Sequence, residues 1–165
     1  MHEAALLIGG NLGERLQLIR RAHTLLSDTG EIVATSSLYE TQAWGAVSEG
    51  NFLNQALILR TPKSPAELIQ STQMIETQLG RTRETHWGNR TMDIDIIYYD
   101  DLVYKDKNLT VPHPLLAERN FVLIPLVEIL PDFVHPVFHL TQRELLYQCP
   151  DKSKVEQYQP NFPEE

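Results

Sequence analysis

Hydrophobic and polar positions alternate along this chain in blocks that predict strands and helices in a regular order. Apolar or β-branched runs predict strands over Ala4–Ile8, Glu31–Tyr39 and Phe52–Arg60, and a fourth strand begins at Asp93. Leucines and isoleucines recur at helical spacing within Glu14–Leu26, which predicts a helix between the first two strands.

The second helix has the clearest boundaries. Ser64 is a suitable N-cap, Pro65 suits the first helical position, and Glu67 completes a capping box. The helix is expected to run to about Leu79, with Gly80 ending it. The resulting order is strand, helix, strand, strand, helix, strand. It predicts an α+β fold, a ferredoxin-like βαββαβ core with an antiparallel sheet.

The segments around this core are predicted as loops and additional elements. Thr41–Asn51 and Arg81–Thr91 have no hydrophobic period and are predicted loops. Asp100-Asp101 predicts a hairpin turn before a short strand near Leu102–Tyr104. Additional C-terminal helices, which would cover the second face or rim of the sheet, are expected near Leu115–Arg119, over Phe121–Ile129 and after the capping-box residue Thr141.

The length of 165 residues is typical of one domain, predicted over residues 1–149, and residues 150–165 are expected to form a polar, poorly ordered tail. Cys149 is the only cysteine, which excludes an intrachain disulfide and fits a reducing cytoplasm. The short apolar run near the N-terminus predicts neither a secretory signal nor a membrane span. A monomer is favoured and a dimer stays open.

The net charge of −8 disfavours a general nucleic-acid binder, because such proteins carry a basic face. Three arginines nevertheless lie within ten positions, at Arg81, Arg83 and Arg90. This cluster predicts a local anion site on an acidic protein.

The most informative chemistry follows these arginines directly. On a strand, Asp93 and Asp95 share one face, while Ile94 and Ile96 face a core on the other side. Two adjacent carboxylates repel each other unless a cation lies between them, and Mg²⁺ is commonly held by one or two carboxylates with phosphate oxygens and water. An exposed, solvated strand face is the alternative for Asp-x-Asp alone. The neighbouring arginines favour phosphoryl-type transfer.

The glycines at positions 9, 10 and 13 could suggest a phosphate loop, but the Lys-Ser/Thr ending of a P-loop is missing from Gly9–Gly13. We therefore interpret this segment as a tight strand-to-helix turn.

The motifs, taken together, resemble the 6-hydroxymethyl-7,8-dihydropterin pyrophosphokinase family of folate biosynthesis, over about Ala4 to Leu146. The strongest is Gly88-Asn89-Arg90-Thr91-Met92-Asp93-Ile94-Asp95-Ile96. It is supported, in the same order along the chain, by Gly9–Gly13, Ser37–Thr41, Phe52-Leu53-Asn54, Gln73–Glu76, Gly80–Arg83, Thr110–His113 and Arg119-Asn120-Phe121. The resemblance implies transfer of an intact pyrophosphoryl group from ATP, the co-substrate, to the pterin hydroxymethyl oxygen, with release of AMP and with two Mg²⁺ ions.

The resemblance also implies roles for individual residues. Asp93 and Asp95 match the metal ligands, and Asp93 also matches a position that contacts the pterin. Asp95 is the candidate acceptor of the hydroxyl proton. The phosphate and catalytic arginines are Arg81, Arg83 and Arg90. The other nucleotide positions are Gln73, Glu76, Ile96, Thr110, His113 and Arg119. The pterin pocket is matched by Thr41, Ala43, Trp44, Phe52, Asn54, Trp87 and Phe121.

Some of these roles have simpler alternatives in the sequence alone. Phe121 could be a core aromatic, and His113, between two prolines, could be an ordinary turn histidine. The chain also departs from the family pattern. Gly10 replaces a usual serine, Gln42–Trp44 replaces a proline-rich segment, and the segment from Arg83 to Trp87 is short, with His86 where a basic residue is common.

Two other functions stay open at this point. One is a different metal-dependent nucleotide enzyme, such as a nucleotidyltransferase, and the other is a non-catalytic ferredoxin-like module that senses a metabolite. For the pyrophosphokinase, we expect Thr41–Asn51 and Arg81–Thr91 to close over the substrates after nucleotide binds, because each carries glycines and one of the two tryptophans.

Overall fold

The computed structural model describes residues 1–42, 51–80 and 90–160. In chain order its elements are β1 (His2–Gly10), α1 (Arg15–Leu26), β2 (Glu31–Thr35), β3 (Tyr39–Thr41), β4 (Phe52–Thr61), α2 (Pro65–Gln78), β5 (Asp93–Tyr99), β6 (Tyr104–Lys105), β7 (Thr110–Val111), η1 (Leu116–Glu118), α3 (Asn120–Ile129), α4 (Gln142–Gln148) and β8 (Val155–Gln157).

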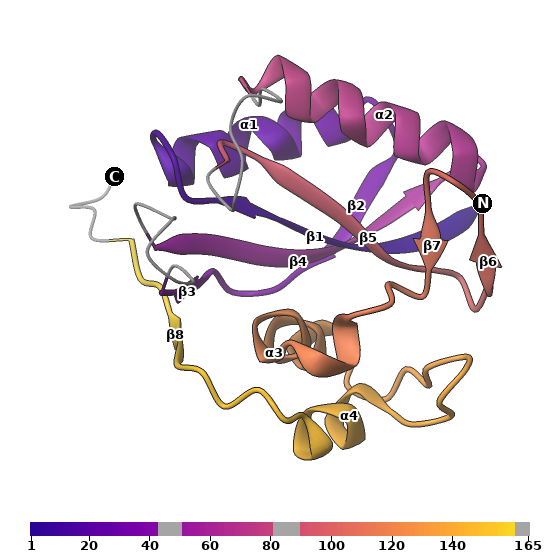
Figure 1. The fold of residues 1–165 in the computed structure, drawn as a ribbon. Helices are drawn as coiled ribbons and strands as arrows, with labels where there is room; N and C mark the ends of the chain where they lie inside the picture. Colours follow the sequence, from indigo (N-terminus) through magenta and orange to yellow (C-terminus); the bar gives the residue numbers. More distant parts are fainter. Residues whose placement is uncertain (43–50, 81–89, 161–165) are drawn as a thin grey trace.

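The main sheet has the strand order β5-β1-β4-β3-β8, and β2 also pairs with β4. Every pairing in it is antiparallel. The first and fourth strands of the βαββαβ unit are therefore neighbours, as the predicted ferredoxin-like core requires. Helices α1 and α2 cover one face, α3 lies against the other, and α4 packs outside α3 (Figure 1).

The alternation of side chains along β1 divides the interior into two cores. Ala4, Leu6 and Ile8 belong to the core beneath α1 and α2, whereas Ala5 and Leu7 belong to the core that α3 and α4 complete. Because both faces of β1 are apolar, its sequence is a continuous hydrophobic run rather than an alternating one. The predicted covering of the second face by the C-terminal helices is confirmed.

The strand predicted over Glu31–Tyr39 is wrong in one respect, because the structure divides it into β2 and β3. At the corner between them, the Ser36 backbone N–H donates to the Ala56 carbonyl at 2.8 Å. The Ala56 N–H donates in turn to the Ser36 hydroxyl oxygen at 2.9 Å. A side chain thus replaces a backbone partner in the ladder, which breaks the strand.

Strand β1 is longer than predicted, because Gly9 and Gly10 continue it instead of opening the turn. A Cβ atom at Gly9 would collide with the Leu53 carbonyl oxygen, and one at Gly10 would lie 2.5 Å from the Thr91 carbonyl oxygen. These glycines serve close backbone approach across the sheet rather than a change of direction.

The segments after β5 differ from the prediction in pairing. Asp100-Asp101 is a turn, as expected, but β6 pairs with β7 rather than with β5. The helix expected near Leu115–Arg119 is a single 3₁₀ turn, η1. No strand is predicted in residues 150–165, yet β8 forms there by backbone pairing with the edge of β3. Such an edge strand needs no apolar pattern, so a polar sequence can supply it.

The capping box of α2 provides a direct test of local stability. Ser64 Oγ accepts from the Glu67 N–H at 3.2 Å, and the Glu67 carboxylate accepts from the Ser64 N–H at 2.8 Å. We expect Ser64→Ala to lower the free energy of unfolding by about 1 kcal/mol and the midpoint of thermal unfolding by about 2–4 °C. Ser71→Ala, within the same helix, is the control and should not lower the midpoint. Equal melting of Ser64→Ala and the wild type would contradict the assigned cap.

Candidate active site

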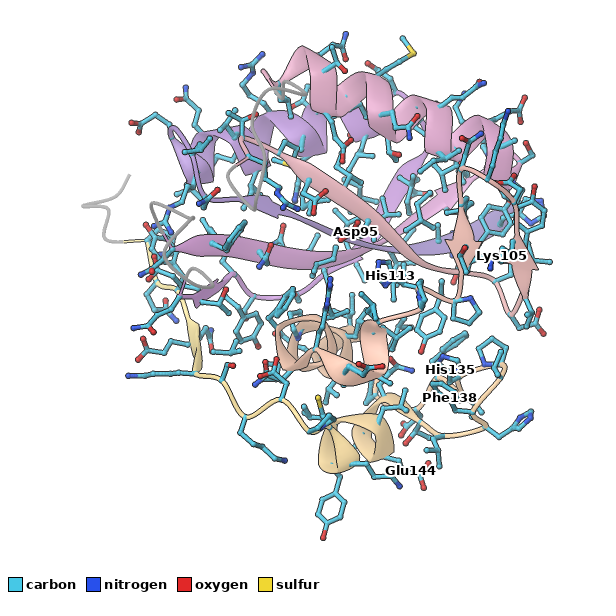
Figure 2. All side chains as sticks on the ribbon, in the orientation of Figure 1. Asp95, Lys105, His113, His135, Phe138 and Glu144 are labelled. Atoms are coloured by element: carbon cyan, nitrogen blue, oxygen red, sulfur yellow. The ribbon has the colours of Figure 1, made fainter. Side chains whose placement is uncertain are left out.

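The centre of the site is the carboxylate pair at the start of β5. Ile94 and Ile96 are buried in the core beneath α1 and α2, so Asp93 and Asp95 face the α3 side of the sheet. The predicted same-face placement is confirmed. Figure 2 shows Asp95 on β5, with His113 on the side toward α3.

Asp95 lies in an environment that opposes its ionisation. Burial, with the neighbouring carboxylates of Asp93 and Glu76, raises its pKa to about 7, although Arg90 and Arg119 act in the opposite direction. Burial and like charges therefore outweigh the two described arginines. An additional cation would lower this energy.

Arg90 is the basic group that contacts the pair directly. Its guanidinium donates to Asp93 at 2.9 Å, and its Cζ lies 5.7 Å from the centroid of the Phe52 ring. Asn11 holds the Arg90 backbone on both sides: its Oδ1 accepts from Arg90 N–H at 2.9 Å, and its own N–H donates to the Arg90 carbonyl at 3.0 Å. The close approach at Gly10 makes room for this contact.

Asn11 is a site-building residue to which the sequence analysis assigned no role. It is 7% exposed and connects the end of β1 to Arg90, which lies three residues before Asp93. The available signal was its position in the Gly9–Gly13 motif, which we interpreted only as a turn. Its side chain instead fixes the position of the Arg90 backbone, from which the guanidinium reaches Asp93.

Glu76 reaches the site from α2 around the outer edge of β5. Its carboxylate accepts from the Ile94 backbone N–H at 2.7 Å. Ile96 directs its backbone N–H to the same edge, because alternate strand residues share an edge, but its side chain is 2% exposed within the core. Gln73 lies one helical turn before Glu76 with its side chain exposed.

His113 is attached to β5 by its backbone, since its N–H donates to the Ile97 carbonyl at 2.9 Å. Burial and the nearby Arg119 lower its pKa, while Asp93 raises it. Nδ1 accepts from the Leu115 N–H at 3.1 Å, so in the neutral ring the proton is on Nε2. His113 thus offers one N–H donor. Thr110, half-buried in β7, precedes it.

The start of α3 lies opposite the sheet surface that carries Asp93 and Asp95, and it supplies two further site residues. The Arg119 Cζ lies 5.8 Å from the centroid of the Phe121 ring. Phe121 is half-buried and packs against the core on the α3 side. The core alternative raised for Phe121 therefore describes part of its surface, and the remainder is accessible beside Arg119.

Asn54 lies in the same row of the sheet as the carboxylates. Tyr39 pairs with Asn54, Asn54 with Gly9, and Gly9 with Asp93 across four strands. The Asn54 side chain occupies the space above Gly9, where a Cβ atom would meet its Oδ1. In the row nearer the strand ends, Thr41 pairs with Phe52. The sheet thus brings the predicted pterin residues Thr41, Phe52 and Asn54 close to one another.

Several predicted site residues lie outside the described part of the chain, and so do most residues of the two segments expected to close over the substrates. They are Ala43, Trp44, Arg81, Arg83 and Trp87, together with the substituted position His86.

The described residues fit a divalent cation that takes its other ligands from elsewhere. Within residues 1–42, 51–80 and 90–160, no group of three or more His, Cys, Asp or Glu side chains is arranged to hold a metal. Asp93 and Asp95 are nonetheless a destabilised pair of oxygen donors. This suits Mg²⁺, which keeps water and phosphate oxygens among its ligands. The described residues thus place two carboxylates, two arginines and the amide of Asn54 on one side of the sheet, a combination that suits phosphoryl-type transfer.

Comparison with known proteins identifies the family. The model of the 7,8-dihydro-6-hydroxymethylpterin-pyrophosphokinase (HPPK) family matches residues 5–131. A 2-amino-4-hydroxy-6-hydroxymethyldihydropteridine pyrophosphokinase of Aquifex aeolicus is 40% identical over 137 residues, 83% of this chain and 86% of the relative. The protein of that name from Bacillus subtilis is 43% identical over 128 residues, 76% of this chain and 77% of its own.

Longer proteins contain a similar unit. The folic acid synthesis protein FOL1 of Dictyostelium discoideum is 36% identical over 155 residues, which are 94% of this chain and 24% of FOL1. Among solved structures, Plasmodium falciparum HPPK-DHPS with pteroate has a TM-score of 0.73 at 18% identity, covering 89% of this chain and 42% of that one. At this identity the likeness establishes the ferredoxin-like α+β fold alone.

The chain belongs to the HPPK family. It is accordingly a pyrophosphokinase, which transfers a pyrophosphoryl group from ATP to hydroxymethyldihydropterin in folate biosynthesis. ATP is its co-substrate. Within the described residues, none of the helices has the length and apolar character needed to cross a membrane.

The half-buried carboxylate pair Asp93 and Asp95 leads to a prediction about stability. Asp95→Asn removes the charge whose burial beside Asp93 is unfavourable and keeps the side-chain volume. In EDTA at pH 8, we expect the variant to unfold at a higher temperature, by about 2–4 °C for each 1 kcal/mol gained. Asp100→Asn is the control and should not raise the midpoint, because the Asp100 carboxylate is stabilised by hydrogen bonds that it accepts from the Glu3 N–H and from His2. A lower midpoint for Asp95→Asn would show that the Asp95 charge is satisfied in the metal-free protein.

Proposed function

We propose that Asp93 and Asp95 hold two Mg²⁺ ions on which the pyrophosphoryl transfer depends. The observation that carries this proposal is the burial of Asp95 beside two further carboxylates, which opposes its ionisation. When bound at Asp93 and Asp95, the ions would supply positive charge that offsets the negative charge of the nucleotide phosphates. Positive charge of this kind favours transfer because the reaction needs alignment and neutralisation more than covalent help.

We assign the nucleotide side of the site to the residues around the outer edge of β5. Arg90 and Arg119 supply positive charge beside the carboxylates, and the neutral His113 supplies its Nε2–H donor to an anionic oxygen. Gln73 and Glu76 on α2, the Ile96 backbone and Thr110 complete the proposed contacts. Arg81 and Arg83 are proposed as phosphate ligands on the resemblance alone.

We assign the pterin to the α3 side of the sheet. A pterin is a flat heteroaromatic with donors and acceptors along its edge, so an aromatic face and an amide can recognise it. Phe121 supplies the aromatic face, and the buried Asn54 can donate and accept at the pterin edge. Phe52 and Thr41 bound the pocket, with Asp93 at its inner end. Ala43, Trp44 and Trp87 are proposed members on the resemblance alone.

The reaction balances without a redox or covalent-enzyme step. The pterin hydroxymethyl oxygen forms a bond to the β-phosphorus, and the bond from that phosphorus to the oxygen bridging the α-phosphorus breaks. AMP leaves with that oxygen, and the hydroxyl proton passes to a base, for which Asp95 stays the predicted candidate.

The family match favours this reaction over the nucleotidyltransferase and the sensing module. We further propose a monomer that works in the cytoplasm, where ATP is supplied.

The deciding assay is pterin-dependent formation of AMP, rather than ADP, from ATP. We expect AMP with Mg²⁺ and none above background with EDTA. In Asp95→Asn, we expect turnover to fall by about two to four orders of magnitude, in line with the loss of charge stabilisation at a transferring group. Asp100→Asn, on the turn beyond β5, should leave turnover unchanged. Near-normal AMP formation by folded Asp95→Asn, or by wild type in EDTA, would refute the metal assignment.

Arg90 should act on the triphosphate more than on the fold. We expect Arg90→Ala to lower kcat/KM by about 10²–10³-fold, while the midpoint of thermal unfolding changes by only a few degrees. The ion pair to Asp93 is about one-quarter exposed on both sides and contributes little to stability. Arg60→Ala, which removes an exposed pair with Glu3, is the matched control and should keep full activity. Collapse of stability with normal turnover of the folded fraction would make Arg90 a structural residue.

A further inference from the structure

Glu128, near the end of α3, has a carboxylate whose two oxygens both accept hydrogen bonds from the segment where β2 leads into β3. One oxygen accepts from the Ser37 backbone N–H and from the Ser37 hydroxyl, both at 3.0 Å. The other accepts from the Tyr39 hydroxyl at 2.7 Å. Although Glu128 is an exposed residue, a single side chain thus makes three hydrogen bonds to the corner between β2 and β3.

This corner leads directly into the proposed pterin pocket. Tyr39 pairs with Asn54, and both side chains lie on the α3 side of the sheet. Two residues further along β3, Thr41 pairs with Phe52. The position of β3 against α3 therefore sets one border of the surface on which Asn54 lies.

The same helix carries the opposite border. Phe121 stands seven residues before Glu128, within α3 (Asn120–Ile129). Seven residues are close to two helical turns, so the two side chains project from the same side of α3, about 10 Å apart along its axis. A carboxylate that ties this side of α3 to β3 consequently fixes the aromatic wall relative to the amide.

Two neighbouring features stabilise the hydrogen bonds of Glu128 to Ser37 and Tyr39. Gln157 of β8 donates to the Ser37 hydroxyl at 3.3 Å, so the C-terminal strand holds the corner from its other side. Burial and the Glu128 carboxylate raise the pKa of Tyr39, which keeps the phenol protonated and a donor.

We propose that Glu128 is a positioning residue for the pterin: its hydrogen bonds to Ser37 and Tyr39 hold α3 against β3 and so set the separation of Phe121 from Asn54. This inference rests on the proposed pterin pocket, and it concerns a side chain that does not itself touch the substrate. It affects pterin affinity more than nucleotide affinity, because most of the proposed nucleotide residues lie around β5, at the opposite edge of the sheet from β3, and Arg119 alone adjoins Phe121.

Two substitutions test the role of the hydrogen bonds between Glu128 and the corner between β2 and β3. Glu128→Gln keeps the shape but turns one acceptor into a donor, so either Ser37 or Tyr39 loses its partner. Tyr39→Phe removes only the hydroxyl and serves as the second variant should Glu128→Gln fold poorly. We expect each to raise KM for the pterin by about 5–10-fold, less than the full effect of losing one hydrogen bond to a charged acceptor, because the lost bond acts on the pterin only through the position of α3. KM for ATP should stay within about twofold. The effect of the double variant should fall short of the product of the two single effects, because both substitutions act on the hydrogen bonds of the same carboxylate.

The matched control is Glu31→Gln, the same change at an exposed glutamate at the far end of β2, where its closest described partner is Arg60 at 4.0 Å. It should leave both KM values unchanged. A lowered unfolding midpoint with an unchanged pterin KM in both test variants would show a purely structural tie and overturn the inference. If wild type and Glu31→Gln form no AMP at all, the proposed function fails instead.

Discussion

The repulsion between Asp93 and Asp95 is the constraint on which the site depends. Alternation along β5 forces both carboxylates onto one face, because Ile94 and Ile96 are needed for the core on the other. Burial denies Asp95 the water that would screen its charge. The apolar half of the strand thus creates the electrostatic requirement of its polar half, and core packing and demand for a cation arise from the same seven residues.

The surrounding polar groups leave that requirement largely unmet. Glu76 uses its carboxylate on the Ile94 backbone N–H, which fixes a further negative charge beside the pair. Burial lowers the pKa of His113, which favours the neutral ring, a donor without a charge. Of the described groups, Arg90 and Arg119 alone lower the pKa of Asp95. Among the described residues, the three carboxylates of the site therefore outnumber its two arginines, which favours the binding of a cation.

The sequence predicts the core of this arrangement because period and caps are local signals. The pattern of Asp93–Ile96, the capping box at Ser64 and the order of elements all survive in the structure. Ser36 shows where such signals end: its side chain interrupts a strand through a bond to Ala56, twenty residues away. Asn11 shows the same for the site, since its partner Arg90 lies 79 residues further along the chain. Contacts of this range have no periodicity to detect.

The C-terminal helices illustrate how an addition to a simple fold becomes part of its chemistry. A four-stranded ferredoxin-like sheet with α1 and α2 would leave the face bearing Asp95 and Asn54 open to water. Helix α3 covers the apolar half of that face with its own core and brings Arg119 and Phe121 to the edge of the polar half. Helix α3 packs through apolar side chains such as Leu123 and Leu126, and polar contacts at its two ends add to its attachment. At its first turn, the Asn120 N–H donates to Asp151 at 3.2 Å, and at its last turn Glu128 bonds to the β2–β3 corner. In our proposal, the separation of Phe121 from Asn54 thus depends on side-chain contacts between segments that are distant in the sequence.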